Sequence, residues 1–138
     1  MFVAFFLTRR VQLLQPIMTM ETCIFCQIVE KKLPAKIWYE DDDLFIISTI
    51  EPLAPVHLLV IPRQHITSLN EASLAETSLL GRLLLGARKA AQLSGISESG
   101  YRTVLNTGAG GGQTVFHLHI HVLGGAPIDR SLLTKGLR

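Results

Sequence analysis

The sequence predicts a single α+β domain with one long helix. Apolar residues repeat at spacings of three and four over one long segment, as they do along the buried face of a helix. Several shorter segments are rich in β-branched residues and are separated by proline, glycine or aspartate, which is typical of strands joined by turns. A chain of 138 residues is long enough for one such domain to bury a core of its own.

The first part of the domain is expected to form a short helix and three strands. Apolar residues at helical spacing, followed by Pro34, predict the helix, because proline cannot continue one. Short runs rich in apolar and β-branched residues predict the strands. Three consecutive aspartates at 41–43 are interpreted as a turn, which is commoner for such a run than a metal site. The expected bounds are 24–31 for the helix and 37–40, 44–50 and 57–61 for the strands.

The long helix is expected over 68–93. Ser68 and Glu71 have the spacing of a capping box, which satisfies backbone N–H groups at a helix start. Gly81 and Gly86 each weaken a helix by up to about 1 kcal/mol relative to alanine, and we expect close packing on the sheet to explain them. Two later strands are expected over 101–106 and 115–123, with a glycine-rich turn at 107–112 between them.

Composition excludes several classes of protein. The net charge is +2 and no basic stripe is visible, so nothing in the charge pattern favours nucleic-acid binding. No apolar run reaches the roughly 18 residues that a membrane-spanning helix needs. Two cysteines are too few for a disulfide-framed secreted domain. We therefore expect a cytoplasmic protein without membrane or nucleic-acid partners.

The first twenty residues are expected to be separate from the domain, which then covers 21–138. Their positive charges, Arg9 and Arg10, follow the apolar stretch, whereas a secretory signal carries them before it. A disordered tail or an upstream start codon explains residues 1–20 best. An organelle transit peptide and a membrane-surface helix are less well supported alternatives.

Three histidines occupy alternate positions, 117, 119 and 121. Side chains alternate between the two faces of a strand, so all three imidazoles are expected to share one face. The residues between and after them are apolar and are expected to face the core: Leu118, Ile120 and Val122.

Two kinds of chemistry fit this arrangement. Alternating histidines can hold a zinc ion, or a neutral histidine can attack phosphorus while a neighbouring group fixes its tautomer. The loop 108–112 favours the second, because glycines let backbone N–H groups approach an anion closely. Gln113 and Thr114 add polar side chains at the same place.

Together these residues resemble the signature of the histidine-triad (HIT) family of nucleotide hydrolases and transferases, in particular its adenosine monophosphoramidase branch. The resemblance covers about Cys23 to Gly125 and includes 54–62, 101–106 and 112–123. It implies an antiparallel meander sheet with a long helix and a short N-terminal helix. It also implies a homodimer, formed by joining two sheets, and a purine nucleotide as the small-molecule partner.

The resemblance also implies roles for individual residues. His119 would attack the α-phosphorus to form a nucleotidyl-histidine, which water then hydrolyses. His121 would orient the triad, its backbone fixing the tautomer of His119, while His57 would complete the site together with His117. Contacts to phosphate, ribose or leaving group are implied for Asn106, Gly112, Gln113 and Thr114. A sandwich around the base is implied for Ile24, Phe25, Ile28, Ile47 and Ile50, for each of which a purely structural role in the core fits equally well.

The sequence departs from the family pattern in three places. Thr49 stands where phosphoramidases usually carry an aspartate for the ribose hydroxyls, and threonine cannot accept two hydrogen bonds in the same way. Thr114 stands where serine is common, so the hydroxyl is kept. The Trp-Pro-Pro ending of that branch is missing, so its leaving-group specificity does not transfer.

A structural zinc site is also implied, because some bacterial relatives hold zinc with a similar set of residues. The corresponding ligands are Cys23, Cys26, His65 and His117. Four protein ligands form a closed set with no open position, so such a zinc would be structural rather than catalytic. Two reduced cysteines and a surface histidine without metal are the alternative.

Four functions therefore stay open at this point. The first is hydrolysis of a purine nucleoside phosphoramidate through His119. The second is the same chemistry on dinucleoside polyphosphates. The third is a metal-dependent hydrolase that uses the three histidines as ligands, and the fourth is a nucleotide-binding regulator with negligible turnover.

Overall fold

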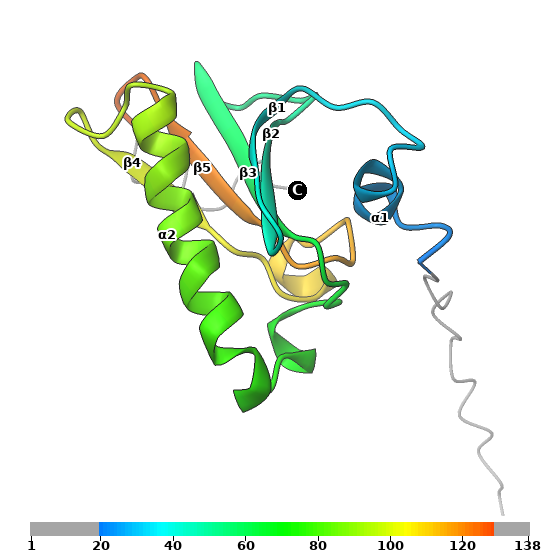
Figure 1. Ribbon diagram of the computed structural model, residues 1–138. Coiled ribbons are helices and arrows are strands. Elements are labelled where there is room, and N and C mark those ends of the chain that lie inside the picture. Colours follow the sequence, from blue (N-terminus) through cyan, green and yellow to red (C-terminus); the bar gives the residue numbers. More distant parts are fainter. Residues whose placement is uncertain (1–19, 129–138) are drawn as a thin grey trace, which may run out of the picture.

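The computed structural model describes residues 20–128, which form a five-stranded antiparallel sheet with a helix on each face (Figure 1). The helices are α1 (Ile24–Val29) and α2 (Thr77–Leu93). The strands are β1 (Ile37–Glu40), β2 (Leu44–Ser48), β3 (Val56–Pro62), β4 (Tyr101–Val104) and β5 (Ile120–Gly124). The predicted α+β class is confirmed. The predicted extension over 1–20 lies outside the described residues apart from Met20, as does the C-terminal ending.

The sheet has the order β1-β2-β3-β5-β4, with every neighbouring pair antiparallel. The first three strands form the predicted meander. After α2 the chain arrives at the sheet edge as β4, and β5 returns between β4 and β3. This order makes β3 and β5 neighbours, with Leu59 opposite His121, and brings two distant histidine-bearing segments together. None of the described helices is long and apolar enough to cross a membrane.

Alternation along β3 divides its side chains between two buried clusters. Leu58 and Val60 lie in the cluster beneath α2, whereas Leu59 and Ile61 lie in the cluster beneath α1. Figure 1 shows the two helices on opposite sides of the sheet. His57 lies two positions before Leu59 in the same strand, so its side chain is on the α1 face as well.

The long helix begins at Thr77, and the prediction that it begins at residue 68 is wrong. Ser68 and Ser73 each cap a separate short 3₁₀ turn through their hydroxyl oxygens. The complete capping box is formed by Ser73 and Glu76 and not by Ser68 and Glu71, as expected. Two Ser-x-x-Glu patterns follow one another closely, and local side-chain bonds hold each in its own turn, so the helix starts only after the second.

The last strand begins at Ile120 instead of residue 115. Pairing between β3 and β5 ends at Val60 and Ile120, so the residues before Ile120 are not paired with β3. Leu118 instead donates its N–H to the carbonyl of Ile66 in the segment after β3, at 2.7 Å. The other predicted elements are confirmed with ends that differ by up to two residues.

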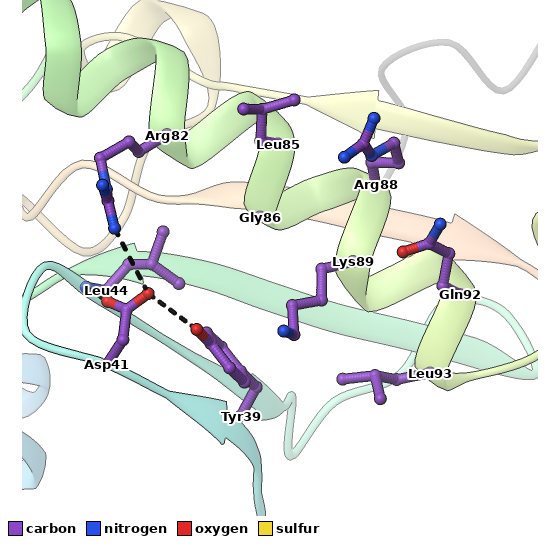
Figure 2. A pocket seen from close by; sticks show the side chains of 10 residues that line it. All are labelled: Tyr39, Asp41, Leu44, Arg82, Leu85, Gly86, Arg88, Lys89, Gln92 and Leu93. Atoms are coloured by element: carbon purple, nitrogen blue, oxygen red, sulfur yellow. Dashed lines mark hydrogen bonds and ion pairs between the residues drawn. The ribbon is translucent and has the colours of Figure 1, made fainter.

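The aspartates between β1 and β2 form a turn, as predicted. One carboxylate oxygen of Asp41 accepts the N–H groups of Asp43 and Leu44 at 2.8 and 2.9 Å, and the other accepts the Tyr39 hydroxyl. Arg82 of α2 pairs with Asp43 at 2.7 Å. Figure 2 shows this corner, where α2 and the β1–β2 hairpin border a hollow of about 590 Å³.

The two helix glycines differ in their surroundings. A Cβ at Gly86 would lie 2.8 Å from a methyl of Val60 and 3.2 Å from one of Leu44, so α2 approaches the sheet through the missing side chain. A Cβ at Gly81 would meet nothing within 4 Å. Close packing therefore explains Gly86, and the expectation that it also explains Gly81 is wrong.

This difference predicts opposite effects of the same substitution. Gly81→Ala should raise the free energy of unfolding by up to about 1 kcal/mol, since alanine favours the helix and has room. Gly86→Ala should lower it by about 1 kcal/mol or more, because Val60 and Leu44 must move. Urea denaturation of both variants checks this, and equal effects of the two would contradict the packing argument.

Candidate active site

Four histidines gather on the α1 face of the sheet. His57 comes from β3 and His121 from β5, while His117 and His119 lie in the segment just before β5. All four are at most 6% exposed. Leu118, Ile120 and Val122 face the α2 cluster, as predicted. The apolar residues therefore hold the three triad imidazoles on the opposite side, although His121 is the only one of these three that lies in a strand.

His119 has a tautomer fixed by the main chain. Its Nδ1 lies 2.7 Å from the carbonyl oxygen of His117. A carbonyl only accepts, so Nδ1 carries the proton and Nε2 keeps its lone pair. The prediction that the backbone of His121 does this is wrong, because the carbonyl two residues earlier is the one in reach. Burial lowers the pKa of His119, so the ring is held neutral.

His57 and His121 form a second pair. Nε2 of His57 lies 2.9 Å from Nδ1 of His121, and the backbone N–H of Leu53 donates to Nδ1 of His57 at 3.1 Å. Burial lowers the pKa of His57, and burial together with neighbouring imidazoles lowers that of His121 to about 3. Both rings are therefore neutral near pH 7. Among buried side-chain nitrogens and oxygens in residues 20–128, Nε2 of His121 alone has no hydrogen-bond partner.

A second cluster joins α1 to the triad. Sγ of Cys23 and Sγ of Cys26 lie 3.4 and 3.6 Å from Nδ1 of His117, and Nδ1 of His65 lies 3.3 Å from Cys26 and 3.1 Å from His117. The four donor atoms all lie within 4.8 Å of one another. These four residues lie close enough to hold a metal ion, as the family resemblance implied.

The donor set also has the chemistry of a metal site. Tetrahedral ligands at about 2.0–2.3 Å from zinc stand roughly 3.3–3.8 Å apart, close to the spacings observed. Nε2 of His117 faces the carbonyl of Pro62 at 2.8 Å, so its proton is there and Nδ1 is free to bind. Burial raises the pKa of the Cys26 thiol to about 12, so a cation would have to displace that proton.

The triad is arranged differently from a three-histidine metal site. Within the described residues, the group with metal-ligand spacing contains His117 but neither His119 nor His121. Nδ1 of His119 is bound by a carbonyl, and Nδ1 of His121 by His57. The geometry therefore offers no support for the alternative in which one metal is shared by the three imidazoles.

The glycine loop is held by its own hydrogen bonds. Gln113 is 3% exposed, and its side-chain amide accepts from the N–H of Gly108 and donates to the carbonyls of Thr67 and Val115. The N–H groups of 111, 112 and 113 also donate within the loop. These N–H groups are therefore not free to bind an anion. The buried Gln113 side chain instead connects the loop to Thr67 and Val115. The hydroxyl-bearing Thr114 is exposed.

The residues expected to enclose a base differ in their exposure. Phe25 and Ile47 are buried, and the Phe25 ring meets those of His117 and His119 edge-on at centroid distances of 5.6 and 5.2 Å. Ile24 is 43% and Ile50 96% exposed, so both have surface to offer a ligand. Ile28 is half-buried beside the α1 cluster.

Two polar candidates are bonded locally. The Thr49 hydroxyl accepts the N–H of Glu51 at 3.3 Å, and the amide of Asn106 reaches the carbonyl of Gly112 at 3.5 Å. Sequence reasoning missed three backbone groups that orient imidazoles: the carbonyls of Pro62 and His117 and the N–H of Leu53. Backbone groups carry no residue-type signal, so only the folded geometry reveals them.

The buried imidazoles predict an acid-sensitive fold. An unfolded histidine binds a proton below about pH 6.5, whereas His121 in the fold does so only near about 3. The unfolded state therefore binds more protons in that window, and stability should fall as the pH drops from about 6.5 toward 3. His121→Asn should reduce that slope by up to about 1.4 kcal/mol per pH unit. Urea denaturation across this range tests it, and an unchanged slope would refute the assignment.

Comparisons with known proteins agree with this geometry. A model of the HIT domain matches residues 30–128. Protein HitA of Neisseria gonorrhoeae is 47% identical over 105 residues, which cover 76% of this chain and 97% of that protein. Purine nucleoside phosphoramidase of Escherichia coli K12 is 42% identical over 117 residues, covering 85% and 98%. The solved HIT family hydrolase from Clostridium thermocellum superposes with a TM-score of 0.78 at 44% identity, covering 80% of this chain and 96% of that one. The chain therefore belongs to the HIT-domain family.

Proposed function

We propose that this HIT-family enzyme hydrolyses purine nucleoside phosphoramidates by nucleophilic attack of His119 on the α-phosphorus. The observation that carries the proposal is the 2.7 Å contact between Nδ1 of His119 and the carbonyl of His117, which leaves a neutral ring with its lone pair on Nε2. The similarity to a purine nucleoside phosphoramidase at 42% identity supports the substrate class.

The reaction then has two balanced steps. In the first, the Nε2 lone pair forms a bond to phosphorus, the P–N bond breaks, and the leaving nitrogen takes a proton from solvent. The ring becomes a nucleotidyl-imidazolium, whose Nδ1–H stays on the carbonyl of His117. In the second step, water attacks phosphorus and the P–Nε2 bond breaks. Nucleoside monophosphate and one proton are released, which replaces the proton taken from solvent.

Charge stabilisation is the remaining requirement, because the transferred phosphoryl group carries negative charge on its oxygens. The neutral His121 ring, whose Nε2 lacks a protein partner, supplies a hydrogen bond to one of these oxygens. Donors in a site shielded from water act more strongly than in bulk solvent. The exposed Ile24 and Ile50 supply apolar surface for the base.

Loss of the nucleophile should abolish turnover. We expect His119→Ala to lower kcat on adenosine 5′-phosphoramidate by at least about 10⁴-fold, since no other neutral imidazole presents a fixed lone pair there. Release of AMP, measured by chromatography, reports the rate. Mass spectrometry of wild-type protein quenched during turnover should show a nucleotidyl adduct that the variant lacks.

The remaining candidate functions predict other results. Turnover of a dinucleoside polyphosphate but not of the phosphoramidate would identify a different leaving group. Nucleotide binding without turnover of either would indicate a regulator. AMP release that survives His119→Ala would refute the nucleophile.

We propose that Cys23, Cys26, His65 and His117 hold a zinc ion in a structural role. The set comprises two thiols and two imidazoles, and the proton of His117 already faces the carbonyl of Pro62. A bound zinc ion would cross-link α1 to the segment before β5, which carries His119. Four protein ligands fill its tetrahedral shell, so the ion itself would not meet substrate.

Removal of the metal should therefore lower the thermal stability of the protein. We expect the wild type to contain one zinc ion per chain, and Cys26→Ser to lose it and melt roughly 10 °C lower. Metal content by mass spectrometry and melting by circular dichroism test this. A chelator should lower the melting temperature of the wild type without affecting Cys26→Ser, which is the matched control. Equal metal content in both proteins would refute the ligand set.

We also propose that two copies associate through β4, which forms one edge of the described sheet and pairs with β5 alone. Tyr101 at its start is 38% exposed, and Leu84 on α2 is 62% exposed. Pairing of two such edges would continue the sheet and cover apolar surface.

A further inference from the structure

We propose that the main-chain N–H of Leu53 sets the proton positions of His57 and His121, and thereby makes Nε2 of His121 a hydrogen-bond donor toward phosphate. The role toward phosphate rests on the proposed function. The proton positions rest on the protein's geometry alone.

Donor and acceptor chemistry determines these proton positions. A backbone N–H can only donate, so Nδ1 of His57 must accept from Leu53 at 3.1 Å. The neutral ring then carries its proton on Nε2 and donates it to Nδ1 of His121 at 2.9 Å. The neutral His121 ring therefore carries its own proton on Nε2. The lowered pKa values of both histidines, caused mainly by burial, agree with neutral rings.

Nothing at the other end of this chain of bonds selects its direction. Nε2 of His121 has no protein partner among the described residues. With every proton reversed, the bond between the two rings would be equally satisfied, but His121 would present a lone pair to the site. A lone pair repels an anionic oxygen, whereas an N–H binds it. The Leu53 N–H is the group that distinguishes the two states.

The loop between β2 and β3 presents this N–H without help from the Leu53 side chain, which is 51% exposed. The N–H of Thr49 donates to the carbonyl of His57 at 3.3 Å, so the loop is bonded to His57 at two points. Pro52 and Pro55 lack an N–H and restrict the backbone on either side of Leu53. Leu53 is therefore a positioning residue that acts through its main chain.

The wild-type protein gives the first test, without substrate. In full-length protein labelled with ¹⁵N, long-range ¹H–¹⁵N correlation spectra report which ring nitrogen is protonated. We expect the proton on Nε2 of both His57 and His121, and a scalar coupling across the bond from Leu53 N–H to His57 Nδ1. Protonation of His57 at Nδ1 would overturn the proposal, whether or not any variant folds.

A pair of variants gives the second test. Leu53→Pro removes the N–H, whereas Leu53→Ala keeps it and shortens the exposed side chain. Leu53→Ala should retain the wild-type proton positions, and Leu53→Pro should show a mixture of both tautomers at His57 and His121. On adenosine 5′-phosphoramidate, kcat of Leu53→Pro should be about 10-fold to 100-fold below that of Leu53→Ala, with a smaller change in KM. Unchanged tautomers in Leu53→Pro, or equal kcat values, would overturn the proposal.

The two readouts separate this inference from the proposed function. If the spectra show the expected protons but wild-type protein turns over no phosphoramidate, the proposed function fails and the proton assignment stands. The phosphate role is then tested with AMP as the probe. AMP should shift the His121 Nε2–H resonance in the wild type, and the absence of any shift would overturn that role.

Discussion

The alternation of side chains along β5 and the segment before it is the constraint on which the site depends. Leu118, Ile120 and Val122 are buried beneath α2, and each buried apolar side chain contributes roughly 1.5–3 kcal/mol to stability. A shift of the register by one residue would bury imidazoles under α2 and expose these apolar groups. The core on one face therefore fixes His117 and His121 on the other.

Main-chain groups then give these imidazoles their chemical identity. The carbonyl of His117 accepts a hydrogen bond from Nδ1 of His119, so the lone pair of that ring is on Nε2. The carbonyl of Pro62 accepts from Nε2 of His117, so the lone pair of that ring is on Nδ1, which faces the cysteines. Burial keeps the rings neutral by disfavouring the charged form. His117 also links His119 to the cysteine cluster, since its ring faces Cys23 and its carbonyl faces His119. The fold itself thus orients these imidazoles, through main-chain groups.

Predictions from sequence succeeded where a single local pattern, such as the alternation of side chains, determines the structure. The shared face of the triad and the turn at Asp41 were predictable from residue type and local spacing. The cysteine–histidine cluster joins residues far apart in the chain, and it was predicted from the resemblance to the HIT family. Prediction failed where two local patterns compete or where a neighbour must be known. Ser68 and Ser73 offer two similar caps, and the start of β5 depends on where its pairing with β3 ends.

The sequence by itself determined the α+β class, the identity of the histidines and the fact that the triad shares one face. Only the tertiary structure decided which backbone groups face each ring and which histidines form pairs. Strand order brings His57 beside His121, and loop geometry brings the N–H of Leu53 to His57. The physical reason is that backbone donors and acceptors are the same at every residue except proline, which lacks the N–H. Their effect on a side chain depends on distance and direction in the folded chain, which residue types do not encode.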